Sequence, residues 1–260
     1  RSGGTLGSAN HLGRYLGLVL PISLALTLTH RRPWMSRFSS LTTVVGTFAI
    51  FQTLTRSAWI GLFFSIIIMV FLMFHHRLIT FRAVFKLGTM ALAMIAIIIA
   101  LWTPIEKRLF GDDNGSSYTR ITTAKVAMRI IRDYPLFGCG INNYGAVLPD
   151  YWIAEDVFTR EAAVHNNYLL YAAEIGLIGF AAYLWLLMAA GSSIMRAIRS
   201  HNVYFATVAV GIMASFGAYL LEALSDKSYK ESYTLLLSFW GLLAITEALN
   251  RLSKNSKKGL

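Results

Sequence analysis

The sequence predicts an all-α integral membrane protein with about seven transmembrane helices and a partly helical, polar insert between the fourth and fifth helices. Of its 260 residues, 55% are hydrophobic and only 14% are charged, whereas a soluble domain carries about a quarter charged residues. Apolar stretches of about 17 to 23 residues recur along the chain, close to the ~20 residues that cross a bilayer core as a helix. Basic residues also gather in alternate connecting segments, which is typical of a multi-pass membrane protein.

Seven apolar segments of the chain are expected to cross the membrane. They comprise residues 12–28, 38–54, 58–74, 84–102, 168–190, 203–221 and 233–249. With the polar loop 103–167 they are expected to form a single membrane domain, 1–260. Pro21 lies inside the first span, where neighbouring helices can satisfy the carbonyl that it leaves free. The chain opens at Arg1 on a polar Gly/Ser run without an initiator Met, which predicts a fragment whose N-terminal helices are missing.

The charge distribution predicts the orientation in the membrane. One set of alternate loops holds 12 of the 24 Lys and Arg residues and no Asp or Glu, so the positive-inside rule assigns that side to the cytoplasm. The polar insert then lies outside, in the periplasm of a Gram-negative cell. The net charge of +11 is therefore mainly a topology signal, and no basic stripe for nucleic acid is evident.

Within the insert, residues 117–133 are expected to form a helix that a proline ends. Counted at 100° per residue, Arg120 falls on the same face as Ala127 and Ile131. The other basic residues form a separate stripe, made of Lys125, Arg129 and Arg132. This pattern predicts that Arg120 faces a buried surface, where an arginine must be paired or await an anion. The alternative is that Arg120, in the first turn, bends out to water.

Two further residues lie at the outer side of the predicted bundle. His165 ends the insert directly before a new apolar segment; the alternative is an interfacial residue that caps a helix. Arg56 lies in a very short break between two spans, a depth at which ionisable groups often mark a functional path; the alternative is an arginine that snorkels to the headgroups. Guanidinium groups bind phosphate oxygens and imidazole accepts a proton near neutral pH. If they converge, Arg56, Arg120 and His165 suit a reaction between a phosphate-bearing group and a hydroxyl nucleophile.

Other polar features predict less. Asp112-Asp113 and Glu155-Asp156 are adjacent pairs rather than a spaced ligand set, so no metal site is expected. The glycine-rich stretch 138–144 follows no strand, which favours a plain turn over a phosphate-binding loop. Glu174 is expected inside the membrane, on the helix face opposite His165.

Short segments spread through the chain carry a family resemblance. They are Gly4–Leu12, Leu54–Trp59, Arg120, Asp133–Gly140, Val164–Leu169 and Glu174–Gly179. In these segments, their order and their spacing, the sequence resembles the C-terminal two-thirds of the O-antigen ligase and O-antigen polymerase superfamily of polytopic membrane glycosyltransferases. Ser8-Ala9-Asn10 departs from the usual family pattern, so no role is carried over to Asn10.

The resemblance implies a glycosyl transfer at the periplasmic face of the bacterial inner membrane. The implied donor is a glycan on undecaprenyl pyrophosphate, and the implied acceptor is a lipid A–core sugar in ligases or another repeat unit in polymerases. By position, Arg56 and Arg120 would hold the donor pyrophosphate, and His165 would activate the acceptor hydroxyl. The family reaction is expected to need neither metal nor cofactor and to invert the anomeric carbon.

Three alternatives to an O-antigen ligase stay open. A polysaccharide repeat-unit polymerase of the same superfamily shares the motifs. A lipid-linked glycan transporter is disfavoured by the lack of an internal repeat and by the large insert. A non-catalytic membrane scaffold would leave Arg56 and Arg120 without a purpose.

Overall fold

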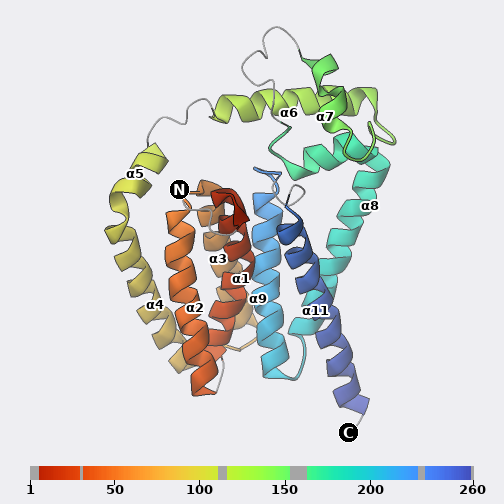
Figure 1. Ribbon diagram of the computed structural model, residues 1–260. Helices are drawn as coiled ribbons and strands as arrows, with labels where there is room; N and C mark the ends of the chain where they lie inside the picture. Colours follow the sequence, from red (N-terminus) through yellow and green to blue (C-terminus); the bar gives the residue numbers. More distant parts are fainter. Residues whose placement is uncertain (1–5, 30–31, 111–115, 153–162, 228–231, 259–260) are drawn as a thin grey trace. The chain divides into compact units, whose positions relative to one another are not determined.

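The computed structural model describes residues 6–29, 32–110, 116–152, 163–227 and 232–258, and these residues are helical apart from their connections (Figure 1). Their long apolar helices are α1 (Ala9–Thr29), α2 (Pro33–Gln52), α3 (Arg56–His75), α4 (Phe81–Ala100), α8 (Asn167–Ile198), α9 (Val203–Glu222) and α11 (Tyr233–Lys258). Each coincides with an expected span, which confirms the all-α class. By length and apolarity six of them could cross a membrane; α2, rich in Ser and Thr, is not among the six. The count of seven spans therefore stays a prediction.

The chain divides into two compact units. The first comprises Arg1–Phe110, Ala190–Leu221 and Ser232–Leu260, and the second, called the insert unit below, comprises Gly111–Ala189 and Glu222–Glu231. The long helix α8 therefore begins in the insert unit and ends in the first unit. The single membrane domain expected over 1–260 stays a prediction.

Helix α1 lies at the centre of the first unit, where it packs against α2, α3, α4 and α11. Small residues allow close packing, since a Cβ added to Gly46 on α2 would lie 2.5 Å from the Leu20 side chain, as is common between membrane helices. Hydroxyl groups satisfy backbone carbonyls across the contacts: Ser215 Oγ donates to the carbonyl of Leu18 (2.6 Å) and Ser23 Oγ to that of Ser39 (2.9 Å). These contacts satisfy backbone carbonyls inside the first unit.

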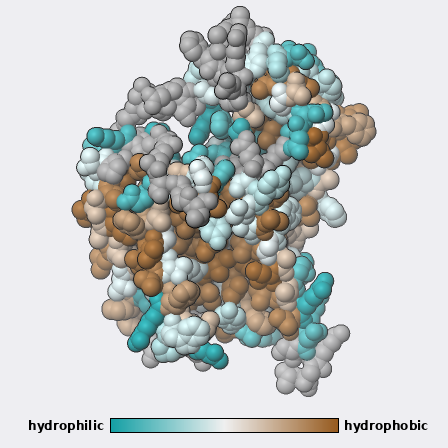
Figure 2. Space-filling view, viewed as in Figure 1, coloured by the Kyte–Doolittle hydropathy of each residue, from teal (hydrophilic) through white to brown (hydrophobic). Residues whose placement is uncertain are grey.

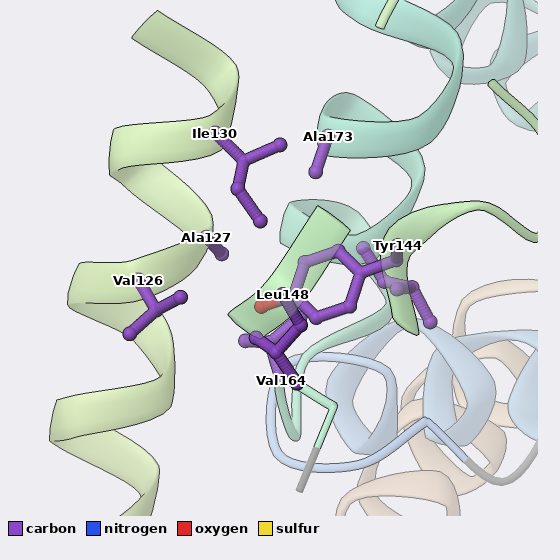
Figure 3. Close-up of a cluster of buried hydrophobic side chains, with 8 residues drawn as sticks. Val126, Ala127, Ile130, Tyr144, Leu148, Val164 and Ala173 are labelled. Carbon is purple, nitrogen blue, oxygen red and sulfur yellow. The ribbon is translucent and has the colours of Figure 1, made fainter. Parts of the chain in front are cut away.

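The insert unit has a hydrophobic core of its own. Helix α6 (Ser116–Asp133), the short helix α7 (Tyr144–Val147) and the 3-10 turn η2 (Leu148–Tyr151) confirm that the insert is partly helical. The core residues are Val126, Ala127, Ile130, Tyr144, Leu148, Val164, Leu170 and Ala173. Figure 3 shows the α6 side chains facing Tyr144, Leu148 and Val164. Burial of these apolar side chains fixes α6 against the start of α8.

Helix α8 is broken at Gly176, whose backbone angles (φ 66°, ψ −179°) are not helical. The expected span 168–190 lies within α8, and the break at Gly176 divides it. A break leaves backbone N–H and C=O groups without helical partners. The loop after α6 provides hydrogen-bond partners for these groups. The N–H groups of Cys139 and Gly140 donate to the carbonyls of Ala173 (2.9 Å) and Glu174 (3.0 Å).

The hydrogen bonds run in the opposite direction on the far side of the break. The N–H groups of Leu177 and Ile178 donate to the carbonyls of Pro135 (2.8 Å) and Leu136 (3.4 Å). Residues 135–140 and 173–178 thus satisfy each other's backbone groups through these four hydrogen bonds, and we call this arrangement the α8 interlock. The glycine-rich stretch, expected to be a plain turn, contributes Gly138 to Gly140 to the interlock.

Two glycines make the close approach in the α8 interlock possible. A Cβ at Gly176 would lie 2.2 Å from the carbonyl oxygen of Leu136, and a Cβ at Gly138 would lie 2.3 Å from the carbonyl carbon of Glu174. Both glycines also have positive φ, 66° and 73°. The combination at Gly176 falls in a region that is essentially accessible to glycine alone.

We expect Gly176→Ala to destabilise the insert unit, because backbone strain of about 1–3 kcal/mol adds to the overlap with Leu136. Thermal unfolding of the purified full chain in detergent would show a lowered midpoint. Gly145→Ala is the matched control, since a Cβ there meets nothing within 4 Å. Equal unfolding midpoints for both variants would contradict the account of the break.

Candidate functional site

His165 lies immediately before α8 and is half-buried. Its neighbour Asn166, not His165, caps the helix, because the N–H of Leu169 donates to Asn166 Oδ1 (3.0 Å), the bond expected of an N-cap residue. The N-cap position of α8 therefore belongs to Asn166, and the interfacial alternative for His165 stays open.

The segment after His165 is fastened to the segment that follows α9. Asn166 Nδ2 donates to the carbonyl of Leu224 (3.0 Å), and the backbone N–H of Asn167 donates to the carbonyl of Ala223 (2.8 Å). Both partners belong to the insert unit. The backbone on the C-terminal side of His165 is thus held by two hydrogen bonds besides its own helix.

The residue before His165 is fixed by the core of the insert unit. Val164 is fully buried in the cluster that contains Tyr144, whose hydroxyl lies beside the backbone of Val164. Burial raises the pKa of the Tyr144 hydroxyl, and the backbone group of Val164 opposes that rise. The phenol therefore stays protonated at neutral pH. The backbone beside His165 is held on both sides, by the core at Val164 and by hydrogen bonds at Asn166 and Asn167.

Acidic side chains are buried in the same unit. Glu222 (1% exposed) ends α9 and Asp226 (6%) follows it, on the segment bonded to Asn166 and Asn167. Glu174 (2%) lies in the first part of α8, before the break. Sequence reasoning passed over Glu222 and Asp226, because only the fold brings their segment, more than 50 residues away, to Asn166 and Asn167.

Arg120 is exposed on α6, so the prediction that it faces a buried surface is wrong. Helix α6 buries the neighbouring face instead, made of Thr122, Thr123, Val126, Ala127 and Ile130. Thr123 tolerates burial because its Oγ1 donates to the carbonyl of Thr119 (2.8 Å). The alternative of an arginine that reaches water fits the structure, and the guanidinium of Arg120 is accessible to a ligand.

Arg56 is the first residue of α3 and is half-buried in the first unit. Its corner is fastened to the start of α1: Thr55 Oγ1 bonds to Asn10 Oδ1 (3.2 Å), and Arg14 Nη2 donates to Ser57 Oγ (3.1 Å). Arg14 is only 1% exposed, and it brings a second guanidinium to this corner. Sequence reasoning gave Arg14 no role, because it lies in the first turns of its helix.

The acidic pairs considered as metal ligands, Asp112-Asp113 and Glu155-Asp156, lie outside the described residues. Within the part of the chain that the structure describes, no group of three or more His, Cys, Asp or Glu side chains could hold a metal ion. The expectation of a metal-free and cofactor-free reaction stays a prediction.

The fold and the site define a class of protein: a multi-pass helical membrane protein with a histidine directly before a long apolar helix. A family model described as O-antigen ligase matches residues 41–184, a range that includes Arg56, Arg120 and His165 and covers more than half of the chain. The chain therefore belongs to the O-antigen ligase family, whose activity is glycosyl transfer of the ligase or polymerase type. A search of curated proteins found no match.

We expect Asn166→Ala to destabilise the insert unit by about 0.5–2 kcal/mol, the typical loss for a helix N-cap, with a further loss from the bond to Leu224. Asn166→Asp is the matched variant, since it keeps the capping oxygen and removes only the Nδ2 donor. Chemical denaturation of both variants would measure the difference. Stability of the Ala variant equal to that of the Asp variant would contradict the capping role.

Proposed function

We propose that the protein transfers a glycan from undecaprenyl pyrophosphate to a sugar hydroxyl of lipid A–core, at the periplasmic face of the bacterial inner membrane. The observation that supports this proposal is the position of His165: it lies in the family-matched range, and the residues on both sides of it are held by the core and by hydrogen bonds. A histidine held in this way loses little conformational freedom when it acts on a substrate. Family membership supplies the reaction class that such a residue would serve.

In this proposal His165 is the general base. The acceptor hydroxyl gives its proton to the imidazole while its oxygen attacks the anomeric carbon of the donor sugar. The bond between that carbon and the pyrophosphate oxygen breaks, and the electron pair leaves with undecaprenyl pyrophosphate. Attack from the face opposite the leaving group inverts the anomeric carbon. The half-buried imidazole then returns its proton to solvent.

Arg56 and Arg120 are proposed to bind the donor pyrophosphate. Guanidinium groups stabilise the negative charge that develops on the leaving group through paired, charge-assisted hydrogen bonds. Arg56 stands at the first residue of α3, where the helix dipole also favours an anion. The exposure of Arg120 supports a ligand-binding role, since its guanidinium is open to a phosphate group.

The rival within the family is a repeat-unit polymerase, which would use the same donor and the same three residues. The two differ in the acceptor, so surface glycans of a strain lacking the gene distinguish them. Loss of capped lipid A–core with free polymer accumulating indicates a ligase, and capping by a single repeat indicates a polymerase. Unaltered glycans with blocked export of the lipid-linked donor would indicate the transporter.

We expect His165→Ala to lower the transfer rate by about 100- to 10,000-fold, the typical contribution of a general base, with donor binding retained. The measurement is glycan transfer in proteoliposomes that contain the lipid-linked donor and the acceptor. His75→Ala, a substitution of an exposed histidine on α3, is the control and should transfer at the normal rate. Full activity of the His165 variant would remove the general base from the proposal.

Arg56→Ala and Arg120→Ala should each weaken donor binding by about 10- to 100-fold, because a hydrogen bond to a charged group contributes about 1.5–3 kcal/mol. Lys125→Ala is the control, since it removes an exposed cation from the same helix as Arg120. Donor affinity is measured with a fluorescent lipid pyrophosphate. An unchanged affinity in either arginine variant would exclude that arginine from the donor site.

A further inference from the structure

Large apolar side chains are exposed in the loop that follows α6. The exposed fractions are 56% for Leu136, 77% for Phe137 and 72% for Ile141. Figure 2 shows hydrophobic side chains gathered at the upper right margin of the molecule, over the turn that follows α6 in Figure 1. We call these three side chains the loop patch. Adjacent exposed apolar residues of this size usually mark a protein or membrane contact.

The α8 interlock joins the loop patch to the start of an apolar helix. The carbonyl of Leu136 accepts from the N–H of Ile178, and that of Pro135 accepts from the N–H of Leu177. Leu177 and Ile178 are themselves 50% and 55% exposed. The loop patch is thus held beside the first turn of α8 after its break.

The length of α8 sets the depth of that first turn in a membrane. From Leu177 to Arg196, the first basic residue at the other end of α8, the helix rises by roughly 28 Å at about 1.5 Å per residue. A bilayer hydrocarbon core is about 30 Å thick. When Arg196 lies at one boundary of the hydrocarbon core, Leu177 therefore lies at the opposite boundary. The loop patch is held beside Leu177 and lies at the same level.

The flanking residues suit the same boundary. Tyr134 is 42% exposed and Arg132 is exposed, and aromatic and basic side chains are favoured at the level of the lipid headgroups. Farther along α8, Trp185 (69%) and Met188 (64%) continue the exposed apolar surface. Exposed apolar side chains thus extend along α8, a helix long and apolar enough to cross a membrane, from the turn beside the loop patch.

We propose that the loop patch inserts into the lipid bilayer, at the boundary between acyl chains and headgroups on the side of the insert. Lipid is its occupant, and the insert unit is anchored to the membrane surface by Leu136, Phe137 and Ile141 in addition to its covalent connections. The anchor would keep His165 at the depth of a lipid-borne phosphate group. The proposal goes beyond the proposed function and holds whether or not the protein transfers a glycan.

The experiment uses the sole cysteine of the chain, Cys139, which Cys139→Ser removes. Phe137→Cys is then labelled with an environment-sensitive fluorophore in the full chain, reconstituted into phosphatidylethanolamine and phosphatidylglycerol vesicles. Asp150→Cys, at an exposed polar position of the insert unit, is the matched control. Quenching is measured with a lipid that carries a nitroxide near the headgroup and, separately, with aqueous iodide.

The label at position 137 is expected to be quenched by the nitroxide lipid several-fold more than the label at position 150, and to be shielded from iodide. Quenching by iodide alone would place the loop patch in water and overturn the proposal. Shielding from both quenchers would mean that protein covers the loop patch, which overturns it equally. Ile141→Cys provides a second labelled position if the Phe137 variant fails to fold.

Discussion

The reciprocal backbone hydrogen bonding in the α8 interlock is the constraint on which the insert unit depends. A helix broken at Gly176 leaves carbonyls and N–H groups that cannot stay unpaired in an apolar setting, and residues 135–140 satisfy both sets. Because the partners are backbone groups, the fit requires glycines at the closest contacts rather than particular side chains. These hydrogen bonds thereby hold the end of α6 in a fixed position relative to the first part of α8.

This fixed arrangement of α6 and α8 accounts for the position of His165, the proposed general base. Asn166 is the N-cap of α8, and His165 directly precedes it. On one side of His165, Val164 lies in the hydrophobic core. On the other side, Asn166 and Asn167 are hydrogen-bonded to the segment after α9. If His165 is the general base, its held backbone reduces the reorganisation that the reaction requires. Arg120 belongs to the same unit, whereas Arg56 belongs to the first unit and has its own support at the start of α1.

Composition and the lengths of the apolar runs were sufficient to predict the long apolar helices, because a bilayer core requires apolar helices of a set length. The break at Gly176 was not predictable, since the apolar run continues through it and its partners lie about 40 residues earlier. The face of α6 was assigned wrongly because Thr122 and Thr123 are buried while the apolar Met128 is exposed. Helical periodicity reports where apolar residues recur, and α6 has them on both sides.

The most direct test of the central claim is a structure of the full-length protein with an undecaprenyl pyrophosphate-linked glycan bound. The account predicts pyrophosphate oxygens within hydrogen-bonding distance of the guanidinium groups of Arg56 and Arg120, with the anomeric carbon facing the imidazole of His165. A pyrophosphate bound away from both arginines, or an anomeric carbon turned away from His165, would contradict the account.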